Sequence, residues 1–226
     1  MTEIAHYEGV ARHLHSDTHV YMKSKITQRT QLAMQTRERV VDISMAMMAE
    51  RGYSGTRLED VAKAMSLTRG AIYGHFPSKA ALYREILSYS QKPLYKVLND
   101  ALNSENDGPQ TIRSFMLNWF SLLFTDLRHR HSTEIFLNKS EMIEEVKDVF
   151  EYEKKLSADM ILGLETIIRR GIEKGEFRSD NDPRLVAIQI YGQVMGLMQS
   201  WLFNPDLYDL DKMREPLVEN FLKILC

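Results

Sequence analysis

Residues 68–79 carry side-chain types that contact nucleic acid. Arginine can form paired hydrogen bonds with a guanine edge, and threonine and tyrosine hydroxyls can reach phosphate oxygens. Four polar residues lie on or beside the N-terminal end of one predicted short helix: Thr68, Arg69, Tyr73 and His75. A second helix start follows, and its backbone amides around Ser78 and Lys79 would attract a phosphate group. The spacing therefore predicts a surface that meets a nucleic acid.

Two short helices joined by a three-residue turn would position this surface. Thr56 and Glu59 have the spacing of a capping box, which predicts the start of the first helix. The turn is 66–68, and its last residue caps a second helix over 69–76, which Pro77 ends. This arrangement is typical of a helix-turn-helix, whose second helix enters the major groove. Small and apolar residues would bury the motif against an earlier helix: Val61, Ala62, Ala64, Leu67, Ala71 and Ile72.

Charge is distributed unevenly along the 226 residues. The formal net charge is −2, yet residues 22–92 hold 12 basic and 6 acidic side chains. Residues 93–226 hold 16 basic and 22 acidic side chains. A basic segment joined to an acidic body favours a polyanion as the partner of the first part alone, with chance asymmetry as the alternative.

The stretch from Arg37 to Leu87, which contains LTRGAIYGHFPSKAAL, resembles the DNA-binding domain of the tetracycline-repressor (TetR) family. The resemblance implies a homodimer that binds a palindromic operator in double-stranded DNA and holds an inducer in a C-terminal cavity. It also implies DNA-facing positions for Thr68, Arg69, Gly70, Tyr73, His75 and Lys79. To these we add three basic residues as expected DNA contacts: Arg57, and Lys25 and Arg29 near the N-terminus.

Three further segments resemble the subgroup that represses multidrug efflux pumps: MKSKITQRTQLAMQTRERVV at 22–41, TEIFLNKSEM at 133–142 and GLMQSWLFNPDLYDL at 196–210. The chain departs from that subgroup at Asn138 and Gly74, where histidine and tryptophan are frequent. The resemblance implies a repressor of an efflux operon that a bulky, apolar small molecule releases from DNA. Two alternatives stay open: a regulator of metabolic or signalling genes, and a helical carrier or enzyme.

The hydrophobic periodicity is helical throughout, and no window alternates as a β-strand does, so the expected fold is all-α. We expect a mobile N-terminal arm over 1–33 and a three-helix DNA-binding domain over 34–80, whose first helix covers 36–51. A helical ligand-binding and dimerisation domain follows over 81–226. Its helices after the one that starts at Ser78 are expected at about 112–127, 133–139, 143–175, 183–203 and 209–225.

Aromatic and methionine side chains are abundant in the C-terminal part, and they line apolar pockets as readily as they fill cores. Both interpretations stay open for each residue. The candidate ligand contacts are Trp119, Phe120, Phe124, Thr133, Phe136, Leu137, Asn138, Glu141, Ile168 and Gln189. Among them, Glu141 could meet a cationic drug or could be a solvated charge.

Residues 185–205 are uncharged and long enough to span a bilayer, but five polar side chains interrupt them. We therefore expect a helix buried between two subunits, and no membrane partner. The single cysteine, Cys226, and the absence of a signal-peptide pattern favour the cytoplasm. His15 and His19 are one helical turn apart, which could suggest a metal site, but no His-Glu-x-x-His pattern accompanies them. No nucleophile or phosphate-loop pattern occurs either, so neither metal, cofactor nor enzymatic activity is expected.

Overall fold

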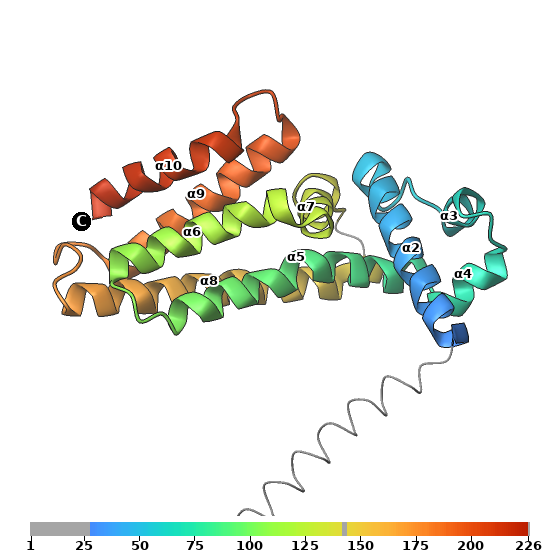
Figure 1. Ribbon diagram of the computed structural model, residues 1–226, viewed down its shortest axis with the longest axis horizontal. Coiled ribbons are helices and arrows are strands. Elements are labelled where there is room, and N and C mark those ends of the chain that lie inside the picture. Colours follow the sequence, from blue (N-terminus) through green and yellow to red (C-terminus); the bar gives the residue numbers. More distant parts are fainter. Residues whose placement is uncertain (1–27, 142–143, 226) are drawn as a thin grey trace, which may run out of the picture. The chain divides into compact units, whose positions relative to one another are not determined.

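The computed structural model describes residues 28–141 and 144–225, apart from the side chains of Gln28, Arg29 and Ile224. All regular elements within that part of the chain are helical (Figure 1). In chain order they are α2 (Gln28–Arg51), α3 (Leu58–Ala64), α4 (Arg69–His75), α5 (Lys79–Leu102), α6 (Gly108–Thr125), α7 (Leu127–Glu134), the π-helix η1 (Ile135–Lys139), the 3-10 helix η2 (Glu144–Val146), α8 (Lys147–Glu173), α9 (Pro183–Phe203) and α10 (Leu210–Leu225).

Side-chain caps define the helix-turn-helix largely as the sequence predicts. The Thr68 hydroxyl accepts a hydrogen bond from the Ala71 amide at 3.2 Å and starts α4. Ser78 caps α5 in the same way through the Ala81 amide, at 3.1 Å. Each cap satisfies one backbone donor that the first turn of a helix leaves unpaired. Helices α4 and α5 therefore begin at fixed residues.

The predicted capping box at the start of α3 is wrong. Thr56 is buried, and its hydroxyl donates to the Gly52 carbonyl oxygen at 2.9 Å instead of accepting from α3. Arg57 is the N-cap residue, without a side-chain hydrogen bond to the helix. Gly52 has a φ of 73°, and the chain turns back there at the end of α2. Thr56 faces this turn, so it stabilises the turn rather than the helix.

A single hydrophobic core fills the C-terminal domain. Its buried residues come mainly from α5, α6, α8 and α9, and they include Leu98, Phe115, Phe120, Leu164 and Ile190. Figure 1 shows α5 and α8 running along each other, with α6 beside them and α10 packed over α6. No helix in the described ranges is both long and apolar enough to cross a bilayer.

Several helix bounds differ from the expected ones. The first helix starts at Gln28 rather than near Thr36, so 28–33, which we assigned to the arm, are helical. The chain breaks at Asp126, which accepts from the His129 amide and caps α7, so two helical segments replace the one expected over 133–139. Ala64, expected to be buried, is exposed. By contrast, α9 has the predicted bounds, with Asp182 as its cap.

Helix α5 is interrupted in its hydrogen bonding between Ile86 and Pro93. The Ser132 hydroxyl accepts from the Ser90 amide at 3.1 Å and donates to the Ile86 carbonyl at 2.7 Å, so it bridges two groups that a regular helix pairs directly. Pro93 lacks the amide that would normally pair with the carbonyl of Tyr89. Nδ1 of the buried His129 lies 3.3 Å from that carbonyl oxygen. Side chains of α7 thus replace part of the ladder of α5.

Candidate DNA interface and ligand cavity

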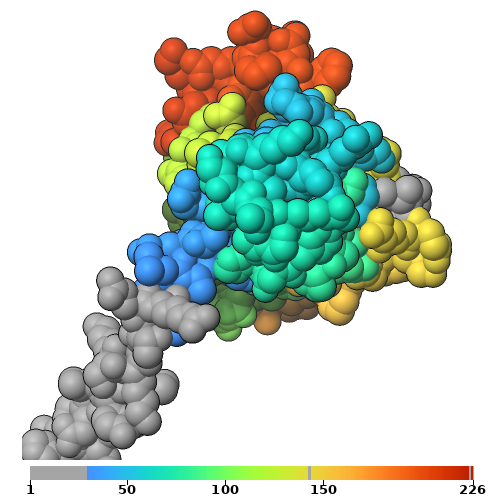
Figure 2. All heavy atoms as spheres, turned by 90° about the vertical axis from the view of Figure 1, so that its right-hand side faces the viewer, coloured from blue at the N-terminus to red at the C-terminus, as the bar shows by residue number. Residues whose placement is uncertain are grey.

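The short helix α4 has one buried and one exposed face. Ile72 is fully buried, whereas Arg69, Gly70 and Tyr73 are exposed. Figure 2 shows the segment that contains α3 and α4, in cyan to green, at the surface facing the viewer. The exposed residues are those that the sequence assigns to DNA, and the capped N-terminus of α4 lies among them.

Arg69 is engaged within the helix-turn-helix. Its guanidinium lies 3.1 Å from the Glu59 carboxylate and 5.2 Å from the centre of the Tyr73 ring. A hydrogen bond with Tyr73, followed by the charge of Glu59, raises the pKa of Arg69 above its usual value. The side chain is charged and 69% exposed. Reading a base requires Arg69 to exchange an exposed ion pair, which is worth little in water, for contacts in the groove.

Gly70 has no steric role within the described fold. A Cβ atom built there would meet only the Thr68 hydroxyl oxygen, at 4.0 Å. Glycine is unfavourable inside a helix, so the fold alone gives no reason for it. A glycine on the exposed face of a recognition helix lets another molecule approach the backbone closely.

The Lys79 side chain, an expected phosphate contact, is engaged within the helix-turn-helix. Its ammonium donates to the carbonyl oxygens of Tyr53, at 2.9 Å, and Thr56, at 3.2 Å, and lies 4.0 Å from the centre of the Tyr53 ring. In this conformation Lys79 ties the start of α5 to the turn before α3. Of the other expected DNA contacts, Arg57 is exposed and His75 is half-buried, Lys25 lies outside the described residues, and the side chain of Arg29 is not described.

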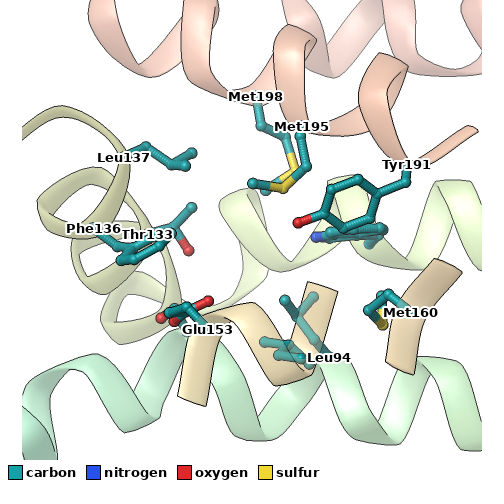
Figure 3. A pocket seen from close by; sticks show the side chains of 12 residues that line it. Leu94, Thr133, Phe136, Leu137, Glu153, Met160, Tyr191, Met195 and Met198 are labelled. Carbon is teal, nitrogen blue, oxygen red and sulfur yellow. The ribbon is translucent and has the colours of Figure 1, made fainter. Parts of the chain in front are cut away.

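An apolar cavity lies inside the C-terminal domain, between α5, α6, α7, η1, α8 and α9 (Figure 3). Its volume is about 30 Å³, enough for one or two water molecules. Its lining is Ser90, Leu94, Trp119, Thr133, Phe136, Leu137, Glu153, Leu156, Met160, Tyr191, Met195 and Met198. In Figure 3, Met195 and Met198 extend into it from α9, opposite Leu94. A drug-sized ligand can therefore enter only if the lining moves.

Four of the ten candidate ligand residues line this cavity: Trp119, Thr133, Phe136 and Leu137. Phe120 and Ile168 are fully buried in the core, and the Phe124 ring packs against Trp201, with 5.2 Å between the centroids. Asn138 holds a buried Nδ2 without a hydrogen-bond partner, but it does not line the cavity. Gln189 is exposed on α9, and Glu141 bonds to Ser54 instead of facing the cavity.

Sequence reasoning missed the one carboxyl group in the lining, Glu153. Helical spacing could have found it, because positions 153, 156, 160 and 164 lie along one stripe of α8, and the last three are buried apolar residues. Met160 was weighed as either a core or a pocket residue, whereas Met195 and Met198, which also line the cavity, were missed. Methionine fills irregular gaps and repacks readily, so these side chains suit a cavity that changes size.

The cavity and the helix-turn-helix are joined by the segment around η1. Phe136 and Leu137 line the cavity, and only a few residues later the Glu141 carboxylate accepts from the Ser54 hydroxyl at 2.6 Å. The Tyr83 and Ser140 hydroxyl oxygens lie 2.8 Å apart. The Tyr53 hydroxyl donates to Glu145 at 3.0 Å, and burial and this contact raise the pKa of Tyr53. Movement of η1 would thus reach the turn between α2 and α3 directly.

Models of two protein families match the chain. Residues 40–86 match the family described as bacterial regulatory proteins, tetR family. Residues 107–226 match the C-terminal region of the MAATS-type transcriptional repressors. The two matches cover the helix-turn-helix and most of the domain that holds the cavity.

Individual relatives agree with these matches. The HTH-type transcriptional regulator AcrR of Shigella flexneri is 30% identical over 87% of this chain and 93% of its own length. The regulator TtgR of Pseudomonas putida is 29% identical over 79% of this chain and 85% of its own. All of these matches are to regulators of transcription rather than to enzymes.

Solved structures of the same kind superpose on the chain. NalD, the secondary repressor of the MexAB-OprM multidrug efflux pump in Pseudomonas aeruginosa, has a TM-score of 0.74 and 26% identity, and the match covers 86% of this chain and 98% of NalD. The SmeT–triclosan complex has a TM-score of 0.67 and 26% identity, covering 81% of this chain and 90% of SmeT. The chain therefore belongs to the TetR family of transcriptional regulators, and its C-terminal region is of the MAATS-type repressor class.

Proposed function

We propose that this protein is a cytoplasmic repressor of a multidrug efflux operon, released from its operator by a bulky, largely apolar small molecule. NalD is a repressor of a multidrug efflux pump and SmeT is known in complex with triclosan, which supports this target and this kind of ligand. The proposal rests mainly on one observation. The chain has an exposed recognition helix and a cavity lined by methionines, and the segment around η1 connects the two through the contact between Glu141 and Ser54.

On DNA, we assign base reading to Arg69 and phosphate contacts to the capped helix starts. Thr68 and Tyr73 are exposed beside Arg69. The backbone amides around Ser78 and Lys79, at the start of α5, would attract a phosphate group. Arg57, His75, Lys79 and the basic residues Lys25 and Arg29 would contribute positive potential or phosphate contacts around them. The domain boundaries expected from the sequence, 34–80 and 81–226, are part of this proposal.

Homodimerisation is proposed through α9 and α10. Beyond Arg184 in its first turn, the exposed positions of α9 follow a helical stripe that carries no charge: Leu185, Ile188, Gln189, Gly192, Gly196, Gln199 and Phe203. Phe203 is 81% exposed, and a Cβ at Gly192 or Gly196 would meet no atom within 4 Å. Such a face supports close packing of a second copy by two-fold symmetry. Two copies would then present recognition helices roughly 34–36 Å apart, one turn of DNA.

The proposed switch starts from the small size of the cavity. A ligand larger than the cavity displaces its lining, part of which lies on α5 and η1, next to the interrupted stretch of α5 and to the Glu141–Ser54 contact. Both elements lead to the helix-turn-helix, so the two recognition helices would change their separation. The ligand acts only through its preference for this DNA-incompetent arrangement.

The test is fluorescence anisotropy with duplexes from the DNA flanking the gene and with random duplexes of equal length. Arg69→Ala should cost about 1–3 kcal/mol on the preferred duplex and much less on random DNA, because a paired contact to a base is lost. Arg178→Ala, which removes an exposed arginine in the loop before α9, is the matched control. Equal losses on both DNAs would refute base reading by Arg69, and indifference of the wild type to sequence would refute the repressor assignment.

A further inference from the structure

One carboxyl group lies in the mainly apolar lining of the cavity. Glu153 extends into it from α8, below Thr133 and Phe136 (Figure 3). Its Oε1 accepts a hydrogen bond from Nε2 of the Gln91 side chain, at 2.6 Å, and Gln91 is itself buried. Among the described residues, no lysine, arginine or histidine forms an ion pair with it. The carboxyl is therefore held in position by a neutral amide, without a countercharge.

Burial acts against the charge of this group. Loss of solvent raises the pKa of Glu153, and the hydrogen bond from Gln91 offsets only part of that effect. A half-buried acid without a countercharge costs stability, and no contact in the core requires it. Its position on the buried stripe of α8 could hold a leucine or a methionine, as the neighbouring positions do.

The groups around Glu153 favour a cation. Thr133 is buried, and its hydroxyl oxygen has no hydrogen-bond partner, so it can accept one. Three aromatic rings share the lining: Trp119, Phe136 and Tyr191, and the first and last have centroids 5.8 Å apart. Aromatic faces attract a desolvated cation, and an ammonium can donate to a carboxylate and a hydroxyl at once.

We propose that the cavity selects apolar amines, with the protonated nitrogen held between the Glu153 carboxylate and the Thr133 hydroxyl and the apolar body packed on the methionines of α8 and α9. The proposal rests on the sensor function proposed above and names its ligand class. An anionic ligand of the same shape is excluded, because it would place a second negative charge beside Glu153. The sequence suggested Glu141 as the partner of a cationic ligand. We assign this role to Glu153, because Glu153 lines the cavity and Glu141 bonds to Ser54 instead.

Three probes with one carbon skeleton test the charge requirement: 4-phenylbutylamine, 4-phenylbutanol and 4-phenylbutyrate. Calorimetric titration of the full chain should give affinities in that order. Glu153→Gln should weaken the amine by roughly ten- to 100-fold, as expected for a hydrogen bond to a charged group, and should leave the alcohol nearly unchanged. Thr133→Val should weaken the amine by roughly two- to tenfold.

Glu151→Gln is the matched control, because it removes the same charge from an exposed position of α8. Folding does not confound the test. Glutamine can still pair with Gln91 and removes the cost of the partly desolvated carboxyl, so the melting temperature of Glu153→Gln should equal or exceed that of the wild type. Any of three results would overturn the proposal. They are binding of the butyrate as tight as that of the amine, an amine affinity that is unchanged in Glu153→Gln, and no binding of the amine at millimolar concentration.

Operator release separates this proposal from the one on which it rests. If 4-phenylbutanol or 4-phenylbutyrate releases the protein from DNA and the amine does not, the amine selectivity is wrong and the sensor function stands. If amine binds through Glu153 but leaves operator affinity unchanged, the amine site stands and the sensor function is wrong.

Discussion

The Glu141 carboxylate accepts two hydrogen bonds from Ser54, one from the hydroxyl at 2.6 Å and one from the backbone amide at 3.3 Å. Ser54 lies in the turn between α2 and α3, and Glu141 follows the π-helix that lines the cavity. The bonds from Ser54 lower the pKa of Glu141, so at neutral pH the carboxylate is ionised and the contact is complete. A short polar link therefore connects the domain that holds the cavity to the helix-turn-helix.

Glu141→Ala should loosen this turn without unfolding the protein. Amide hydrogen exchange at residues 52–56 should become several-fold faster, since the Ser54 amide loses its acceptor. A carboxylate with a depressed pKa stabilises the fold at high pH, so the wild type should lose the protection only as pH falls below about 4.5, the ordinary value for the group. Glu144→Ala, at a nearby exposed position, is the control. Unchanged exchange at 52–56 would show that the link has no mechanical role.

Pro93→Ala should make α5 more regular. Alanine restores a backbone amide that can pair with the Tyr89 carbonyl. Proline inside a helix costs about 3 kcal/mol of stability, and the contact of His129 with the same carbonyl offsets part of that cost in the wild type. We expect a higher melting temperature and slower amide exchange over 86–94. Pro216→Ala in α10 is the matched control, because it removes the other intrahelical proline of the described part, away from the cavity. A lower melting temperature for Pro93→Ala would contradict the account of α5.

His129 should make stability depend on pH. Burial lowers its pKa below the usual 6.5, so the unfolded chain binds the proton more readily than the folded one. Its contribution is complete above pH about 6.5 and is lost as pH falls below that value. His129→Asn keeps a donor near the Tyr89 carbonyl and cannot titrate. Urea unfolding between pH 5 and 8 should show a weaker pH dependence for the variant, and identical slopes would exclude His129 as the cause.

The sequence predicts helix caps well but does not predict contacts between residues that are far apart in the chain. Caps such as Thr68, Ser78 and Asp182 depend on neighbouring residues, and the structure confirms all three. The hydrogen bond from the Ser90 amide of α5 to Ser132 joins residues 42 positions apart, and the contact of Glu141 with Ser54 joins residues 87 positions apart. Hydrophobic periodicity along the sequence cannot predict contacts of this kind. Thr56 shows the opposite failure: its local pattern fits a cap, but burial against Gly52 decides its role.

Gly70→Ala should separate stability from DNA binding. Alanine inside α4 should raise stability by about 0.5–1 kcal/mol, because there is room for its methyl group and it reduces the entropy of the unfolded chain. If DNA approaches this backbone closely, the same methyl group should weaken operator binding by about 1–3 kcal/mol, as overpacking does elsewhere. Thermal unfolding and anisotropy measure the two effects. A variant that binds operator as the wild type does would remove Gly70 from the interface.

Gly196→Glu should prevent dimerisation. A glutamate there has ample space in a single copy, so the protomer should fold, but a second copy would bury an unpaired charge. Sedimentation should give monomers that lose operator affinity. Ala158→Glu on the exposed surface of α8 is the control. A variant that sediments as a dimer would place the interface elsewhere.

The candidate ligand residues show where sequence patterns stop being informative. Phe120 and Trp119 are neighbours on α6, both nearly fully buried, yet only Trp119 lines the cavity. Successive side chains point in different directions around the axis of α6, and the packing of α5, α8 and α9 decides which direction faces the cavity. Helix periodicity identifies the buried face, but not which buried residue borders a void of about 30 Å³.

The central claim is that one molecule couples the cavity to the operator. The direct measurement is a closed cycle: operator affinity with and without a saturating ligand found in a broad panel of apolar compounds, and ligand affinity with and without operator. Couplings of this kind are typically about 1–3 kcal/mol, so we predict operator binding roughly 5- to 150-fold weaker with ligand, and ligand binding weaker by the same factor with operator. Two results would contradict the account. In the first, no compound of the panel binds; in the second, compounds bind but the operator affinity stays the same with each of them.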